Sequence, residues 1–222
     1  MVGPEDKQEE FLVLGDLLKR HSQTMAASLE ALVNTQDARL RMPEDSAFHF
    51  KIFVSFIYTG KIHTTNNPKE WRLLCELWIL GQALKSTTLK DAVTDAMIER
   101  RAMTLEFSSH SHITLVEHLQ TKEQTRTGVG KLLVDTAVSC HRHSIYTDAR
   151  SNNPACLEFF GEVITGLDRI RRGTESEKEV SLRARTGADC MYHEHGNSHV
   201  CYKKMFPPTQ GILRLPQDAM PR

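Results

Sequence analysis

The stretch from Met42 to Gly60 limits the possible folds most, because it combines a helix start, an apolar face and a helix stop. A proline and acidic side chains follow Met42, as is typical of a first helical turn. Large apolar residues then recur at spacings of three and four, which places them on one helix face. These residues are Phe50, Phe53, Val54, Ile57 and Tyr58. Phe56 widens the apolar face and Gly60 suits a C-terminal cap, so the stretch predicts a helix buried in the middle of a domain.

The segments around this helix predict a mixture of strands and helices up to about residue 101. The short apolar run from Phe11 to Leu14 and the alternating segment from Ala38 to Met42 are typical of strands. Helical spacing returns from Glu70, where Trp71 and Trp78 are predicted to lie in the core, and again from Leu89. We therefore expect two or three strands and five helices in this part of the chain.

Four segments of this region resemble BTB/POZ domains, in the order and spacing of that family. Phe11-Leu-Val-Leu-Gly-Asp-Leu-Leu-Lys-Arg-His-Ser22 resembles the family's entry segment, and Arg39-Leu-Arg-Met-Pro-Glu-Asp45 resembles its strand and turn "I-x-L-P-E-D". Phe50-Lys-Ile-Phe-Val-Ser-Phe-Ile-Tyr-Thr-Gly-Lys-Ile62 is similar to its segment "F-x-x-F-V-x-W-L-Y-T-G-x-I". The stretches Leu77 to Leu84 and Leu89 to Ile98 resemble its closing helices.

This resemblance implies an α/β (α+β), mainly helical fold. Residues 2–101 would form a BTB/POZ-like module with a small sheet and helical hairpins. Val2-Gly3 resembles only the last two residues of the family's first strand, so we expect an N-terminally shortened module or a start inside a longer protein. In BTB proteins the N-terminal segment commonly builds the dimer interface, and this chain lacks most of it, which disfavours the usual mode of self-association.

The rest of the chain predicts an extension of this module. Residues 105–172 have helical spacing and would form a helical C-terminal region. Residues 173–222 begin with a charged stretch rich in Gly, Ser and Thr, which predicts a flexible linker followed by a Cys/His-containing tail. The stretch from Val116 to Asp135 and the segment Cys190-Met-Tyr-His-Glu-His195 resemble the tails of a large fungal group of BTB proteins.

The tail carries a pattern of Cys and His residues that suits a metal ion better than the second cluster, Cys140-His141-Arg142-His143, whose histidines complement a helix dipole. Its Cys and His residues follow the spacing C-x2-H-x-H-x3-H-x-C, with His199 as an additional histidine. Thiolate and imidazole are the ligands that Zn²⁺ prefers. The predicted zinc ligands are Cys190, His193, His195 and Cys201. The alternative interpretation is a polar tail whose histidines are solvated.

Composition excludes several classes of function. Lys+Arg and Asp+Glu both number 28, and this balance disfavours binding to nucleic acid or to an anionic membrane, since both require a basic surplus. No apolar run approaches the roughly 20 residues of a membrane span. The five scattered cysteines do not resemble a disulfide framework, so we expect a reducing compartment, the cytoplasm or the nucleus. No signature of a nucleophilic Cys or of a phosphate-binding loop predicts an enzyme.

The resemblance implies a protein-protein interaction module without catalytic activity. Its expected partners are proteins, either a second copy of the chain or a cullin scaffold, in which case the chain would be a substrate adaptor of a ubiquitin ligase. The alternative function is a zinc-binding regulatory protein that uses the Cys/His cluster of the tail.

Overall fold

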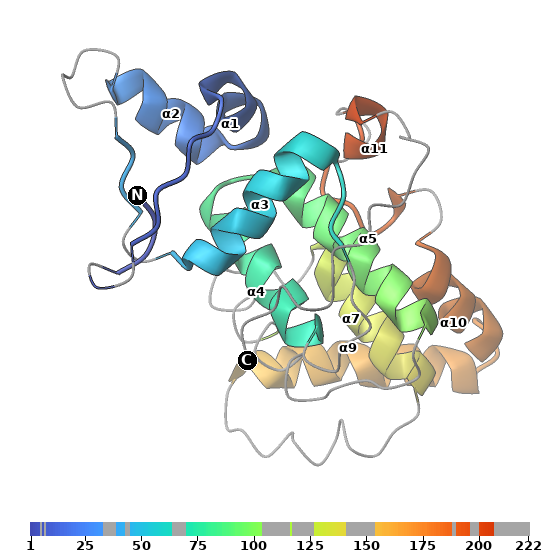
Figure 1. Ribbon diagram of the computed structural model, residues 1–222. Coiled ribbons are helices and arrows are strands. Elements are labelled where there is room, and N and C mark those ends of the chain that lie inside the picture. The colour runs from blue at the N-terminus through green and yellow to red at the C-terminus, as the bar shows by residue number, and fades with distance from the viewer. Residues whose placement is uncertain are drawn as a thin grey trace. The chain divides into compact units, whose positions relative to one another are not determined.

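The computed structural model describes residues 1–4, 6, 8–32, 39–42, 45–63, 70–103, 116, 127–140, 154–187, 190–195 and 200–206. Helix accounts for 72% of these residues and strand for 2%. Figure 1 labels the helices. They are α1 (Gly15–His21), α2 (Gln23–Leu32), α3 (Ala47–Thr59), α4 (Glu70–Ala83), α5 (Thr87–Met103), α7 (Gly128–Cys140), α9 (Pro154–Arg171), α10 (Glu177–Thr186) and α11 (Tyr202–Met205).

The predicted α/β fold with a small sheet is wrong for the part of the chain that the structure describes. Strand pairing there consists of two isolated bridges, Val2 with Glu9 and Val2 with Met42. The apolar run Phe11 to Leu14 does not pair, because it leads directly into α1 and the Leu14 carbonyl accepts the first helical hydrogen bonds. Of the segment Ala38 to Met42, residues 39–42 are described and contribute only the bridge at Met42. A bridge of one residue pair lacks the neighbouring ladder bonds that stabilise a strand.

The predicted helix within Met42 to Gly60 is α3, which ends at the predicted glycine cap but begins at Ala47, later than the predicted first turn. The Ser46 hydroxyl accepts a long hydrogen bond of 3.5 Å from the His49 amide, and Gly60 ends the helix in the left-handed conformation with φ of 71°. Phe53 and Phe56 are fully buried. Tyr58, by contrast, is half exposed, because its hydroxyl reaches the backbone amide of Leu14 at 3.4 Å instead of entering the core.

The chain divides into two compact units. Unit 1 comprises Met1–Thr65, Glu76–Val93 and His195–Arg222. In this unit α1 packs against α2 and α3. The aromatic ring of Phe56 in α3 contacts the rings of Tyr202 and Phe206, at centroid distances of 6.1 and 5.7 Å.

A buried hydroxyl ties α2 to the end of α4 within unit 1. Ser22 donates a hydrogen bond of 2.7 Å to the carbonyl oxygen of Leu84, and its oxygen also accepts from the Met25 amide.

The tryptophan side chains of α4 were predicted to be core residues, and this prediction is confirmed: Trp71 and Trp78 are buried.

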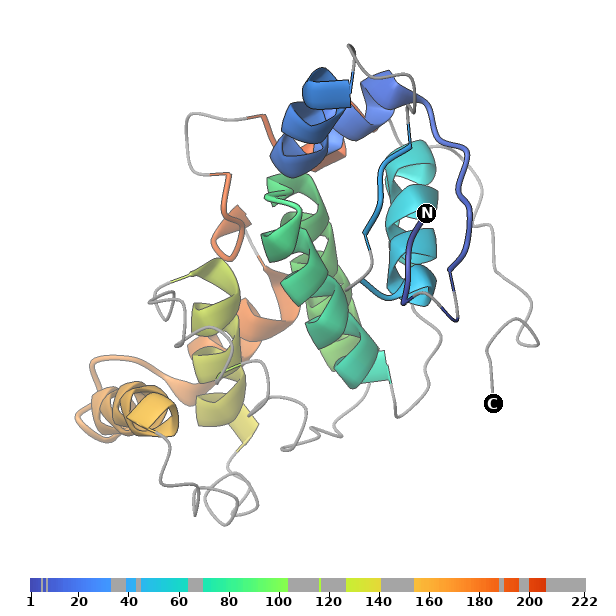
Figure 2. The ribbon, with the colours of Figure 1, turned by 90° about the vertical axis from the view of Figure 1, so that its left-hand side faces the viewer.

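Unit 2 comprises Asn66–Cys75 and Thr94–Glu194, and its core is built by α7, α9 and α10. Helix α7 packs against both α9 and α10. Figures 1 and 2 show α9 crossing α7 steeply, since α9 is seen from the side in one view and nearly end-on in the other. The buried core residues are Val134, Ala137, Val138, Val163 and Val180.

Helix α10 lies in the charged segment for which the sequence predicts a flexible linker. A capping box starts the helix: the Ser176 hydroxyl accepts from the Glu179 amide, and the Glu179 carboxylate accepts from the Ser176 amide. Val180 and Ala184 are the buried residues of this short helix. The capping box and two small apolar residues are therefore compatible with a helix in an otherwise charged sequence.

Candidate metal centre

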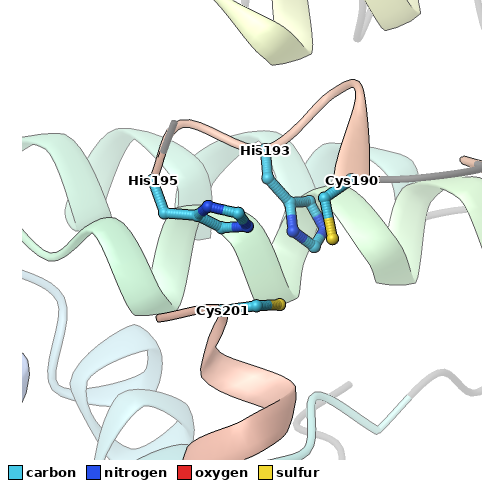
Figure 3. A group of neighbouring side chains, drawn as sticks. All are labelled: Cys190, His193, His195 and Cys201. Carbon is cyan, nitrogen blue, oxygen red and sulfur yellow. The ribbon is translucent and has the colours of Figure 1, made fainter. Parts of the chain in front are cut away.

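The four predicted metal ligands lie together. Each of Cys190, His193, His195 and Cys201 offers one ligand atom, and these four atoms lie within 4.8 Å of one another. Figure 3 shows the side chains of Cys190, His193 and His195 descending from one loop and converging with that of Cys201. The structure therefore brings together all four residues of the predicted set, whereas His199 lies outside the described residues.

The first two ligands are positioned by a tight turn. The amide of His193 donates a hydrogen bond of 2.9 Å to the carbonyl oxygen of Cys190. Cys190 itself has a positive φ of 58°. This conformation is energetically unfavourable for any residue with a Cβ atom. Such a backbone conformation is retained where surrounding contacts hold it, and it bends the chain so that a thiol and an imidazole three residues apart can meet.

The last ligand precedes a short helix. Cys201 is the residue before α11, and its carbonyl oxygen accepts a hydrogen bond of 2.9 Å from the Lys204 amide. The Cys201 side chain is buried, and that of Cys190 is partly buried. Both thiols contribute their sulfur atoms to the cluster.

The chemistry of this donor set is that of a four-coordinate metal site. A tetrahedral zinc ion with two sulfur and two nitrogen ligands separates its donor atoms by about 3.3–3.8 Å. Because the four atoms lie within 4.8 Å, they need to approach by at most roughly 1.5 Å to complete this geometry. The cluster could therefore hold a metal ion.

One carboxylate lies beside the cluster on the side of His193. The Nε2 atom of His193 is 3.1 Å from an oxygen of Asp95, which belongs to α5. The exposed fractions of the two side chains are 2% and 19%, so this contact is shielded from water.

A second buried contact holds the loop between Cys190 and His193. The Tyr192 hydroxyl donates a hydrogen bond of 2.6 Å to Asp135 of α7. Burial, together with this hydrogen bond, raises the pKa of Tyr192 above its ordinary value, so the hydroxyl keeps its proton. The carbonyl of Tyr192 also lies so close to Gly128 that a Cβ atom there would collide with it. The loop is thus held by a side chain and by its backbone.

Asp135 is held in turn by an arginine of α10. The guanidinium group of Arg183 donates two hydrogen bonds to the Asp135 carboxylate, of 2.8 and 3.0 Å, and a third to Glu175. The hydrogen bonds to Asp135 raise the pKa of Arg183, which stays charged. Three segments of unit 2 therefore meet at one carboxylate.

Sequence reasoning did not find these supporting residues. Asp95 and Asp135 stand on helices far along the chain from the ligands, and nothing in their local sequence marks them. Tyr192 was recoverable, because an aromatic residue between two candidate ligands suggests an anchored loop.

Among the described residues, no helix has both the length and the apolar character that crossing a bilayer requires. Comparisons with protein-family models, with curated proteins and with solved structures find no match for this chain. The Cys/His cluster and the carboxylates around it are therefore the basis for assigning a function.

Proposed function

We propose that this chain is a zinc-binding regulatory protein, in which Cys190, His193, His195 and Cys201 hold one zinc ion. The observation that carries the proposal is the approach of four donor atoms to within 4.8 Å of one another. Two thiolates and two imidazoles favour Zn²⁺ over Ca²⁺ and Mg²⁺, which prefer oxygen ligands.

The zinc ion has a structural role in this proposal. Four protein ligands complete the tetrahedral coordination and leave no position for a reactive water molecule, as is typical of structural sites. The chain is accordingly a binding protein and not an enzyme. Its thiols must stay reduced to bind the metal, which supports a location in the cytoplasm or the nucleus.

Metal analysis of the purified full chain tests this function. We expect about one equivalent of bound zinc, and about none after His195→Ala or Cys201→Ser. His63→Ala is the matched control, because it removes an imidazole that is not part of the cluster. Less than about half an equivalent of zinc in the unaltered chain contradicts the proposal.

Exposed apolar side chains in unit 1 support a second candidate function, a protein-interaction module. Leu12 is fully exposed, Leu14 is 64% exposed and Tyr58 is 50% exposed. The hydrogen bond between the Leu14 amide and the Tyr58 hydroxyl places two of these residues side by side. Apolar side chains that gather at a surface are typical of contact sites, and the resemblance of this region to BTB/POZ segments supports the same function.

The partner in this second proposal is a protein, either a second copy of the chain or a cullin scaffold. Light scattering and a pull-down with purified cullin test the two forms. We expect Leu12→Asp to abolish the interaction, and Leu182→Asp, which changes an exposed leucine of unit 2, to leave it intact. A strictly monomeric chain that does not bind cullin contradicts both forms.

A further inference from the structure

We infer that Cys190 and Cys201 are a site of reversible oxidation: a hydroperoxide joins their two sulfur atoms in a disulfide bond, and the cluster then releases its metal ion. This inference rests on the proposed zinc site and adds how the release of zinc is controlled. The two states exclude one another, because a sulfur atom bound in a disulfide no longer offers the thiolate that binds zinc.

The distance between the two sulfur atoms is the first support. The ligand atoms of the cluster, which include both sulfurs, lie within 4.8 Å of one another. Figure 3 shows the thiol of Cys190 pointing from its loop towards the side of the cluster on which Cys201 lies. A disulfide bond is about 2.05 Å long, so the two atoms have at most about 2.8 Å to close. A change of one cysteine between staggered rotamers moves its sulfur atom by about 3 Å. The gap is therefore of the size that a side-chain rotation covers.

The short stretch of chain between the two cysteines is the second support. Cys190 and Cys201 flank one segment, which also carries both histidines of the cluster. Near the start of this segment the Tyr192 hydroxyl is held by Asp135, and at its end Cys201 leads into α11. The entropy lost on closing a loop is small when the loop is short. The two sulfur atoms therefore meet within one molecule at little entropic cost.

The two cysteines also differ in exposure, as a peroxide-sensing pair requires. Cys190 is partly exposed, so a small peroxide can reach it, whereas Cys201 is only 8% exposed. Redox-sensing cysteines are accessible to solvent and have a second, resolving cysteine beside them. Cys75, by contrast, is buried in α4 and does not belong to the cluster. We therefore assign the reaction with the peroxide to Cys190 and the resolving role to Cys201.

The oxidation takes place in two balanced steps. Hydrogen peroxide transfers one oxygen atom to the sulfur of Cys190, its O–O bond breaks, and the other oxygen leaves as water, so that the thiol becomes a sulfenic acid. The sulfur of Cys201 then attacks that of Cys190: the S–S bond forms, the S–O bond breaks, and the hydroxyl group leaves with the thiol proton as a second water molecule. A reducing dithiol reverses the reaction by exchange, which restores both thiols while the dithiol itself becomes a disulfide.

Peptide mapping of the purified full chain is the first test, and it does not depend on bound metal. The chain is treated with hydrogen peroxide, its remaining thiols are alkylated, and it is digested without reduction for mass spectrometry. We expect one disulfide between Cys190 and Cys201, its loss after treatment with dithiothreitol, and an alkylated Cys75. Cys190→Ser removes the thiol that reacts with the peroxide, so we expect no intramolecular disulfide at Cys201 in this variant. Alkylation of both cysteines at a dose that oxidises a reference thiol, or pairing of either with another cysteine, overturns the inference.

Zinc release from the zinc-loaded chain is the second test, and a chromophoric chelator follows it. We expect about one zinc ion to be released for each disulfide formed, and about one to be bound again after reduction. Cys75→Ala is the matched control, because it removes a thiol outside the cluster and should release zinc in the same ratio. An oxidised chain that keeps its zinc overturns the inference while the proposed zinc site stands. An unaltered chain that contains no zinc overturns the proposed function, and the peptide map then decides on the disulfide alone.

Discussion

His21 shows how one buried residue can make the stability of unit 1 depend on pH. Its ring stacks on Phe206 at a centroid distance of 5.3 Å, meets the edge of Phe56, and places Nδ1 3.1 Å from the Thr88 hydroxyl. Burial lowers the pKa of His21 below its ordinary value, and the charge of Arg20 lowers it further. The folded chain therefore favours the neutral ring.

We predict that unit 1 loses stability as the pH falls below about 6.5, the pKa of histidine in an unfolded chain. Between that pH and the lower pKa of the folded state, the unfolded chain binds more protons, so the free energy of unfolding decreases as the pH decreases. Urea unfolding at pH 7.5 and pH 5.5 measures this loss, which His21→Gln should reduce. His63→Gln is the control for removing an imidazole. An equal loss in His21→Gln and the unaltered chain contradicts the prediction.

Helical spacing predicted correctly that the apolar residues at the centre of the α3 face are buried. Phe50, Phe53 and Ile57 are buried as expected. Tyr58 shares the spacing but is half exposed, because its polar hydroxyl finds the Leu14 amide at the surface. Periodicity identifies the face of a helix, but it does not show which polar partner a residue at the edge of that face will find.

Two glycines, one before α10 and one at its C-terminal end, allow a matched test of the contribution of glycine to helix ends. Gly173 and Gly187 both have positive φ, of 70° and 54°. A Cβ atom at Gly173 would meet no atom within 4 Å, whereas one at Gly187 would lie 2.5 Å from the Cδ1 atom of Ile98. The two glycines therefore share a backbone requirement and differ in packing.

We predict that Gly173→Ala lowers the free energy of unfolding by roughly 1–2 kcal/mol, because alanine is disfavoured in the left-handed region. Gly187→Ala should cost roughly 1–3 kcal/mol more, because the buried Ile98 side chain must move. Urea unfolding of the two variants measures the difference. Equal losses would show that contact with Ile98 contributes nothing.

At the level of elements, start and stop signals predicted better than strand patterns did. Gly60 ends α3 as expected, because a glycine cap acts on neighbouring backbone groups, whereas the helix begins at Ala47, after the predicted first turn, with Ser46 as its N-cap. The capping box of Ser176 and Glu179 was equally visible in the sequence, although the charged composition of the segment suggested a linker. Strands failed because pairing depends on remote partners: Met42 meets Val2 by a single bridge.

Across unit 2, the carboxylate of Asp135 joins α7, α10 and the metal-binding loop. It accepts hydrogen bonds from Arg183 and Tyr192. Removing it leaves the partly buried guanidinium of Arg183 with Glu175 as its carboxylate partner, and it deprives the buried Tyr192 hydroxyl of its acceptor. Both groups were desolvated on folding, so the loss is larger than that of one surface ion pair.

We predict that Asp135→Ala lowers the free energy of unfolding by roughly 2–4 kcal/mol. Asp168→Ala is the control, because Asp168 also pairs with two arginines, but these are 82% and 69% exposed. Its loss should cost less than about 1 kcal/mol. Thermal and urea unfolding compare the two variants, and similar losses would contradict a special role for Asp135.

For the molecule as a whole, the sequence predicted the ligands of the candidate site but not what supports them. The four ligands belong to one short segment, so their spacing alone suggested that they could meet. Asp95 and Asp135 reach the loop only through the packing of helices that are distant in sequence. The spacing of residues in the sequence carries no information on how distant helices pack, so it could not predict these two carboxylates.

The contact of Phe56 with Tyr202 and Phe206 has a consequence for the order of events during synthesis. A ribosome adds about 5–20 residues per second, so roughly 8–30 s separate the appearance of Phe56 from that of Phe206. During this interval one side of the α3 aromatic cluster lacks its native cover. We therefore expect the nascent chain to expose this apolar surface until the residues of α11 and Phe206 have been added, which makes it a natural point of contact for molecular chaperones.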